Sequence, residues 1–394
     1  MADGTIDAER VGGAAKLSTD KITTTTRDPN ELGWRIGAWM TAWLPQGTTA
    51  EVYDVAKPEG NGMSSETLLY SARWIEDGTP VQRRFVARIE PELDKVPIFP
   101  SYDLRLQFDV MALVGAATEA PVPEVLWFEA DGAVIGAPFF VMARSDGEVP
   151  PDVMPYTFPD SCWLSHASTA DRMRLQCSAV EALVGIHQVT PEVHDLDFLV
   201  PDQPGATSLE RHLGGWEDYL EWATADDRSP LLDECFAWLR ANLPEEGGDT
   251  GAPRLSWGDA RIGNMMFVDF EVAAVLDWEM ASVAPPEVDL GWMVYLHRFF
   301  QDITTDLGAD GMAEFMRPVD VVSTYEAASG RRVGDLRWHI AYAAMRHGVI
   351  MRRVTERGVL FGEAERPADA DDMIIHRATL SGMLDGTYWQ TLAL

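Results

Sequence analysis

The sequence predicts an α+β protein with two lobes, in which a small antiparallel sheet is followed by a larger, mainly helical part. Three observations support this fold class. Alternation of apolar and polar residues, which is typical of half-buried strands, fills residues 51–89. Apolar residues at helical spacing dominate from residue 170 onward. A stretch rich in Pro, Gly and Asp at 145–159 separates the two patterns and is the best candidate for a linker.

The first half of the chain alternates between strand patterns and turns. Residues 1–30 are polar and predict a loosely ordered tail. Turn clusters at 58–62 and 76–78 separate three strand patterns, which we expect to pair as antiparallel neighbours. One helix on a five-stranded sheet then gives a small lobe over residues 31–144. The expected elements are helices at Leu32–Leu44 and Tyr102–Val114, and strands at Glu51–Lys57, Thr67–Ile75, Arg83–Ile89, Val125–Glu129 and Pro138–Ala143.

The second half, residues 145–394, is predicted to be a helical lobe that one hairpin interrupts. The hairpin pairs Asn264–Val268 with Val272–Leu276 around a turn at 269–271. His187 lies near the end of the first helix and is interpreted as a packed histidine rather than a catalyst. The expected helices are Ala170–Gln188, Leu209–Ala223, Leu231–Asn242, Pro286–Phe300, Val319–Ala328 and Leu336–Arg357.

Composition argues against several classes of function. The chain has 31 Lys plus Arg against 63 Asp plus Glu, a formal net charge of −32, which opposes binding to nucleic-acid phosphates. No apolar run approaches the ~20 residues that a membrane-spanning helix requires. The three cysteines lack the spacing of a metal site or a disulfide framework, so we expect a reducing, cytoplasmic environment. The acidic surface favours solubility and would attract a cationic small molecule.

The segment around Asp259 carries the main chemical signal. Asp259 lies in a turn, Asn264 follows five positions later at the start of the hairpin, and Asp277 ends the other hairpin strand. A tight hairpin brings Asn264 and Asp277 to the same end of the ribbon, where an amide oxygen and a carboxylate suit Mg²⁺. Asp259 would deprotonate a substrate hydroxyl, and Arg261 could reach the transferring phosphoryl group. Kinase catalytic loops have this spacing, although each residue alone could be an ordinary turn cap.

A second signal is a glycine-rich turn between two strand patterns. It half-matches G-x-G-x-x-G, with Ser65 at the third glycine position. Because a strand follows rather than a helix, the context suits a hairpin loop over nucleotide phosphates, and a plain hairpin turn explains it equally well. Arg88, on the next strand, stands where a cation would contact the α- and β-phosphates. The candidate loop residues are Gly60, Asn61, Gly62, Ser64 and Ser65.

Five motifs carry a resemblance to a known family. They are Trp257–Asn264 (W-G-D-A-R-I-G-N), Val275–Glu279 (V-L-D-W-E) and Asp289–Trp292 (D-L-G-W), supported by Pro121–Val125 and Pro138–Met142. In these motifs the chain resembles the aminoglycoside phosphotransferase/choline kinase-like family, and within it the actinobacterial aminoglycoside phosphotransferases. The resemblance implies a two-lobed protein-kinase-like fold that uses ATP and Mg²⁺. It also implies phosphoryl transfer to a hydroxyl of a small molecule, such as an aminoglycoside, another amino alcohol or a sugar.

The resemblance also implies a role for each matching residue. Asp259 becomes the catalytic base, Asn264 and Asp277 become the metal ligands, and Asp289 braces the catalytic loop. The implied nucleotide contacts are the phosphate loop at Gly60–Ser65, the cation Arg88, and a hinge of Met142, Ala143 and Arg144 that faces the adenine.

Three positions depart from the family's pattern. Trp257 stands where the family usually has His, and Arg88 stands where Lys is more common. Gln107 occupies the helical position where a Glu would pair with that cation. A guanidinium is a planar fork rather than a point charge, and a neutral amide holds such a cation less firmly than a carboxylate does. Gln107 and Trp257 therefore motivate an alternative, a nucleotide-binding pseudokinase without turnover, against which the two retained metal-ligand candidates speak. No sequence feature indicates the oligomeric state.

Overall fold

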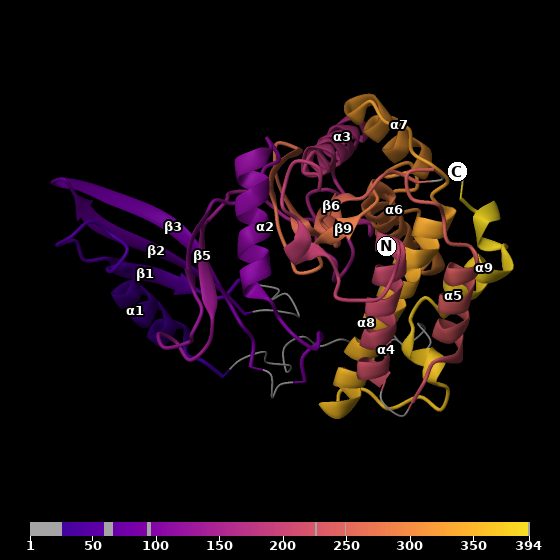
Figure 1. The fold of residues 1–394 in the computed structure, drawn as a ribbon, viewed down its shortest axis with the longest axis horizontal. Helices are drawn as coiled ribbons and strands as arrows, with labels where there is room; N and C mark the ends of the chain where they lie inside the picture. Colours follow the sequence, from indigo (N-terminus) through magenta and orange to yellow (C-terminus); the bar gives the residue numbers. More distant parts are fainter. Residues whose placement is uncertain (1–25, 59–65, 93–95, 225–226, 249, 393–394) are drawn as a thin grey trace, which may run out of the picture.

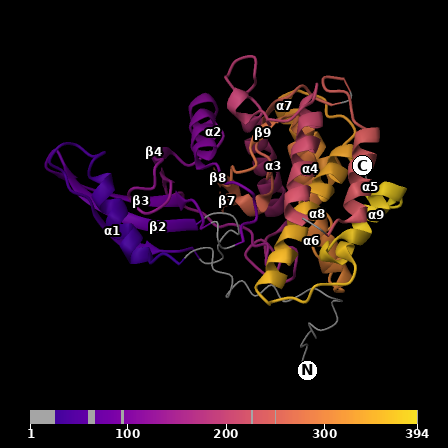
Figure 2. The same ribbon diagram turned by 60° about the horizontal axis from the view of Figure 1, so that its bottom comes forward.

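The chain divides into a sheet-based lobe and a larger helical lobe, and both views place them side by side (Figure 1, Figure 2). This computed structural model describes residues 26–58, 66–92, 96–224, 227–248 and 250–392. The arrangement confirms the predicted α+β class with its small antiparallel sheet. Helix α2 (Leu104–Ala117) lies between the sheet and the helical lobe in Figure 1.

The first lobe is a five-stranded antiparallel sheet in the order β1-β2-β3-β5-β4. Successive side chains of β3 point to opposite faces of the sheet, so alternate residues pack into two different clusters. Phe85, Ala87 and Ile89 pack with the first helix, whereas Val86 packs on the α2 side. Arg88 shares the face of Val86 and is therefore directed toward the helical lobe. The strands are β1 (Glu51–Ala56), β2 (Glu66–Glu76), β3 (Thr79–Ile89), β4 (Val125–Glu129) and β5 (Phe139–Ala143).

Helix α1 (Pro29–Met40) begins earlier than the sequence interpretation placed it. Asp28 caps the helix by accepting a hydrogen bond from the Glu31 N–H at 2.9 Å, and Pro29 occupies the first turn. Arg27 pairs with Glu66 of β2 at 2.9 Å. Pro29 and Asn30, the last two residues of the predicted tail, thus belong to this helix, because Asp28 and Pro29 together form a helix start signal.

The second lobe contains all the predicted helices, with ends that differ by a few residues. The hairpin forms between β7 (Met265–Val268) and β8 (Glu271–Val275). Sequence analysis missed the short pair β6 (Arg254–Ser256) with β9 (Ser282–Ala284), because three residues are too few to show an alternation. It also missed the last helix. The helices are α3 (Thr169–Ile186), α4 (Ser208–Thr224), α5 (Pro230–Ala241), α6 (Pro286–Asp306), α7 (Pro318–Ser329), α8 (Arg337–Leu360) and α9 (Arg377–Asp385).

The stretch proposed as a linker is tied to the helical lobe. Glu148 and Phe267 of β7 exchange two backbone hydrogen bonds of 2.9 Å each, so the stretch lies beside the hairpin. None of the helices in the described ranges is long and apolar enough to cross a bilayer. Cys162, Cys177 and Cys235 are all free thiols.

Acidification is expected to destabilise the helical lobe through its buried histidines. Burial lowers the pKa of His212 and His376 to about 4 and that of His297 to about 3. The unfolded chain, with a histidine pKa of about 6.5, therefore binds protons first, so stability falls as pH drops from about 6.5 to 4. Thermal melts across this range should show the loss. His376→Leu should flatten the slope, whereas His166→Gln, at a side chain that is 63% exposed, should leave it unchanged.

Candidate active site

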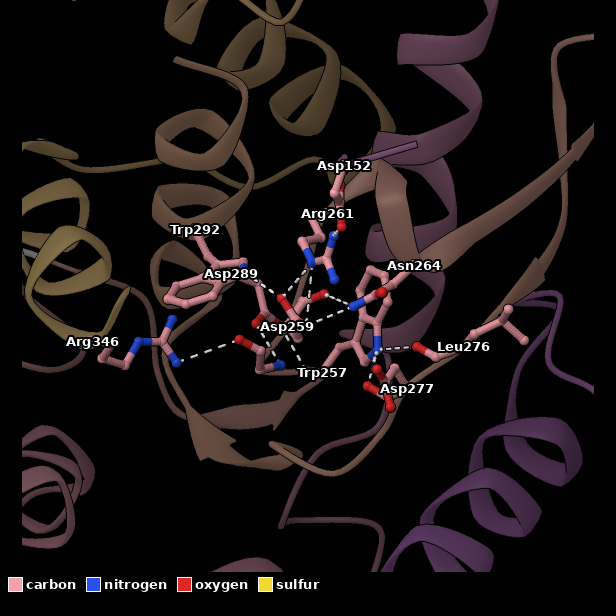
Figure 3. Close-up of polar contacts among 11 residues, drawn as sticks. Asp152, Trp257, Asp259, Arg261, Asn264, Leu276, Asp277, Asp289, Trp292 and Arg346 are labelled. Atoms are coloured by element: carbon pink, nitrogen blue, oxygen red, sulfur yellow. Dashed lines mark hydrogen bonds and ion pairs between the residues drawn. The ribbon is translucent and has the colours of Figure 1, made fainter. Parts of the chain in front are cut away.

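Asp259 lies at the centre of a polar cluster between β6 and β7 (Figure 3). Its Oδ1 accepts a hydrogen bond of 2.6 Å from the Trp292 indole N–H, and its Oδ2 accepts one of 2.6 Å from the Asn264 amide. Arg261 Nε donates to the same carboxylate at 3.1 Å. The Asp259 side chain remains 13% exposed. Three donors thus fix the carboxylate in place while part of it stays open.

Asn264 and Asp277 lie at one end of the hairpin, as the spacing predicts. The Leu276 N–H donates to the Asn264 carbonyl at 2.9 Å, which holds the two strand ends together. Because the Asn264 amide N–H₂ donates to Asp259, its amide oxygen is turned away from that carboxylate. This oxygen and the Asp277 carboxylate are hard donors from the two strand ends that the Leu276 backbone hydrogen bond holds together. Mg²⁺ commonly takes one or two protein ligands together with substrate phosphates, so the two residues suit that ion.

Arg88 connects the two lobes at this point. Its Nη2 donates to Asp277 Oδ1 at 3.0 Å, and the two side chains are only 16% and 20% exposed. Gln107, which stands in place of the expected acid, is buried, and its Nε2 has no hydrogen-bond partner in the described ranges. The carboxylate that Arg88 contacts is thus a candidate metal ligand. Binding of nucleotide phosphates and a metal ion would have to separate this pair.

Arg261 lies between two carboxylates. It pairs with Asp259 and with Asp152, which belongs to the stretch at 145–159. Burial opposes its charge, but the carboxylates of Asp259 and Asp152 outweigh that effect and raise the pKa of Arg261. In this arrangement its guanidinium holds Asp259 and the stretch at 145–159 together, whereas the sequence suggested a contact with the transferring phosphoryl group.

Asp289, in the first turn of α6, braces the loop that precedes Asp259. Its carboxylate accepts hydrogen bonds of 2.8 Å from Ser256 Oγ and from the N–H groups of Trp257 and Gly258. His187, the residue that caps the C-terminus of α3, lies with its Nε2 3.0 Å from the same carboxylate. This buried histidine is thus a hydrogen-bond partner of Asp289. Burial disfavours the charge, yet these hydrogen bonds keep the pKa of Asp289 below its usual value.

Trp257 replaces the family's usual histidine and still connects the loop to the hairpin. The side chain is fully buried, and its indole N–H donates to the Leu276 carbonyl at 2.9 Å and to the Asp277 carbonyl at 3.3 Å. Asp277 has a left-handed φ of +60°. The indole therefore supports the backbone of a residue in a conformation that non-glycine residues rarely adopt.

Gly258→Ala is expected to disrupt the loop. Gly258 has a φ of +88°, and a Cβ there would lie 2.0 Å from the Met280 carbonyl oxygen. An L-residue in this conformation costs roughly 1–2 kcal/mol before any clash is counted. The melting temperature should fall clearly more than in Gly330→Ala, a left-handed glycine with φ +69° and no atom within 4 Å of the new Cβ. Equal losses in the two variants would contradict the steric account.

The remaining candidate nucleotide contacts fall into two groups, one outside the described residues and one in or just after β5. Gly60, Asn61, Gly62, Ser64 and Ser65 lie outside the described residues. Met142 is buried in β5. The N–H groups of Ala143 and Arg144 donate to Glu124 and Arg84 carbonyls at 2.8 and 3.0 Å, so they are not free to donate to a base.

Sequence reasoning gave no role to three residues of the cluster: Asp152, Arg346 and Trp292, the last of which ends the D-L-G-W motif. Trp292 could have been found, because it follows Asp289 by three positions in a helix and so shares its face. Asp152 lies in an irregular segment and Arg346 lies two helices away, so no local pattern marks them.

Comparison with known proteins places this site in a family. A model of the phosphotransferase enzyme family matches residues 70–318. Among curated proteins, a probable acyl-CoA dehydrogenase from Arabidopsis thaliana is 25% identical over 76% of this chain and 36% of its own length. Acyl-CoA dehydrogenase family member 11 from Homo sapiens is 30% identical over 43% of this chain and 20% of its own. The chain therefore spans only a minor part of these relatives.

Solved structures show the same fold. A protein described as an aminoglycoside phosphotransferase from Ralstonia eutropha has a TM-score of 0.63 and 22% identity, covering 91% of this chain and 98% of that one. An aminoglycoside 2″-phosphotransferase in complex with GDP and kanamycin has a TM-score of 0.52 and 14% identity, covering 92% and 100%. An ethanolamine kinase from Plasmodium vivax has a TM-score of 0.51 and 11% identity, covering 84% and 82%. Since the family model covers more than half of the sequence and includes the catalytic loop and hairpin, the chain belongs to the phosphotransferase enzyme family.

Proposed function

We propose that this phosphotransferase moves the γ-phosphoryl group of ATP to a hydroxyl of a small molecule and requires Mg²⁺. One observation carries the proposal: Asp259, Asn264 and Asp277 gather on a loop and hairpin, with Arg88 of the other lobe in contact with Asp277. A base, two oxygen ligands and a phosphate-binding cation are the parts that phosphoryl transfer needs.

In the proposed reaction, Asp259 orients the acceptor hydroxyl and takes its proton. The hydroxyl oxygen forms a bond to the γ-phosphorus as the bond between that phosphorus and the bridging oxygen of ADP breaks. Trp292, Asn264 and Arg261 keep the Asp259 carboxylate in one orientation throughout. Asn264 and Asp277 would hold Mg²⁺, which neutralises charge on the phosphates. Arg88, released from Asp277, would bind phosphate oxygens.

The acceptor is proposed by class. Two of the structural relatives are a phosphotransferase in complex with kanamycin and an ethanolamine kinase, and kanamycin and ethanolamine are both amino alcohols. The net charge of −32 would favour the approach of such a cation. The names of the curated relatives add a second class to test, a hydroxylated acyl thioester. A cytoplasmic location, in keeping with the free cysteines, is part of the proposal.

A transfer assay tests the proposal directly. The full chain is incubated with γ-labelled ATP or GTP and with kanamycin, ethanolamine, choline, simple sugars and a hydroxyacyl thioester. We expect label to appear in at least one acceptor class, and we expect EDTA to abolish the transfer and added Mg²⁺ to restore it. Tight nucleotide binding without transfer to any acceptor would instead support the pseudokinase alternative that Gln107 and Trp257 suggested.

A further inference from the structure

The indole of Trp292 makes the closest hydrogen bond to Oδ1 of the candidate base. Trp292 is 2% exposed, and its Nε1 donates to Asp259 Oδ1 at 2.6 Å. It lies one turn after Asp289 on α6. The two side chains hold the loop in complementary ways, because Asp289 accepts from the loop's backbone N–H groups and Trp292 donates to its carboxylate.

A buried cation stacks on this indole. The guanidinium carbon of Arg346, on α8, lies 4.2 Å from the centroid of Trp292, 4.8 Å from that of Tyr342 and 5.8 Å from that of Trp216. Arg346 is 2% exposed and forms no ion pair with any carboxylate in the described ranges. Its Nη1 donates to the Gly258 carbonyl at 3.4 Å. In Figure 3 the Arg346 side chain and Asp277 lie on opposite sides of Asp259.

Such a cation is costly to bury. Its Nε and Nη2 have no hydrogen-bond partner among the described residues, and burial lowers its pKa. Aromatic faces compensate in part, since the negative face of an indole attracts a desolvated cation. Methionine or leucine would fill the same space without this cost. We therefore expect the charge of Arg346 to have a role in positioning the groups beside it, which are Trp292 and the catalytic loop.

A close approach of α6 to α8 makes this stack possible. Gly291, next to Trp292, faces His339 of α8, and a Cβ at Gly291 would lie 2.7 Å from the His339 backbone carbon. Only glycine lets the two helices approach so closely. This approach brings Arg346, two turns further along α8, over the Trp292 ring.

We propose that Trp292 and Arg346 are positioning residues that hold the Asp259 carboxylate in the orientation needed to take the acceptor's proton, an inference that rests on the proposed function. An indole N–H is a donor only and has a fixed direction, so it selects one rotamer of the carboxylate. The cation on the ring face keeps the indole from tilting. Arg346 thus acts through Trp292.

Trp292→Phe tests the hydrogen bond while keeping an aromatic ring for Arg346. We expect kcat to fall by about 10–100-fold, as for the loss of a hydrogen bond to a charged group, with the KM values for nucleotide and acceptor nearly unchanged. Trp338→Phe is the matched control, because Trp338 is also a buried tryptophan of the helical lobe, but its indole N–H donates to the Leu239 carbonyl of α5 at 3.0 Å. A kcat loss equal to that of the control, or a loss confined to KM, would overturn the inference.

A double-mutant cycle tests whether Arg346 acts through the indole. Arg346→Met should lower kcat when it is made alone, but it should lower kcat little further in the Trp292→Phe background. If the two residues acted independently, the two fold-losses in kcat would multiply. Arg346→Lys, which keeps a cation over the ring, should recover part of kcat and remains informative if Arg346→Met fails to fold. Fully multiplicative losses would contradict the coupling.

An NMR measurement separates this inference from the proposed function. The Trp292 indole N–H, assigned among the 14 tryptophans by its loss in Trp292→Phe, should resonate downfield and shift in both Asp259→Asn and Arg346→Lys. This readout needs no acceptor. If the wild type transfers phosphate to nothing in the panel, the proposed function fails, whereas an indole resonance that stays fixed in both variants overturns the Trp292–Arg346 pair.

Discussion

Replacing Asp259 by Asn is expected to lower kcat by about 10²–10⁴-fold, the range that general-base catalysis supplies. The side chain keeps its size but can no longer accept the acceptor's proton. Its new N–H₂ would also face donors, because both carboxylate oxygens already accept hydrogen bonds from Trp292, Asn264 and Arg261. We therefore expect the amide to turn away from its present position and add to the loss.

Steady-state transfer to the acceptor identified in the panel measures this effect, and calorimetry measures nucleotide binding in parallel. The nucleotide Kd should change little, since Asp259 is not among the candidate nucleotide contacts. Asp109→Asn provides a control at an exposed carboxylate that pairs with Arg105 on α2. Undiminished transfer by Asp259→Asn would show that another group takes the proton.

Local patterns in the sequence were sufficient for the fold and for the hairpin end of the site. Asn264 and Asp277 come together because a two-stranded ribbon with a tight turn leaves no other arrangement of its ends. The five strands of the first lobe likewise follow from alternation and turn residues. These inferences depend only on residues that are close together in the chain, so the sequence alone was sufficient to make them.

Contacts between distant segments were beyond that reasoning. Arg88 was expected to face nucleotide phosphates, and its pairing with Asp277, 189 residues later, depends on how the lobes meet. Arg261 was expected to reach toward the phosphoryl group, yet the position of Asp152 gives it a second carboxylate. In both cases the sequence indicated the right charge near the site but not its partner, because partner choice is set by tertiary packing.

Asp289→Leu is expected to have the largest effect on stability. It removes a buried carboxylate and leaves the Ser256 hydroxyl, two loop N–H groups and His187 without their acceptor. Breaking one side of such a buried network costs about 3–5 kcal/mol. Denaturant unfolding at neutral pH measures the loss, and Asp109→Leu should cost at most about 1 kcal/mol, as exposed ion pairs do.

The pH dependence of this loss distinguishes it from general damage. Because the pKa of Asp289 is lowered in the folded state, its stabilisation is fully present above about pH 4 and is lost only as pH falls through the lowered value. The difference between wild type and Asp289→Leu should therefore stay constant from pH 8 to pH 5, where the buried histidines change the stability of both proteins alike. A difference that shrinks steadily from pH 8 to pH 5 would contradict this account, because the lowered pKa of Asp289 places the loss of its stabilisation below about pH 4.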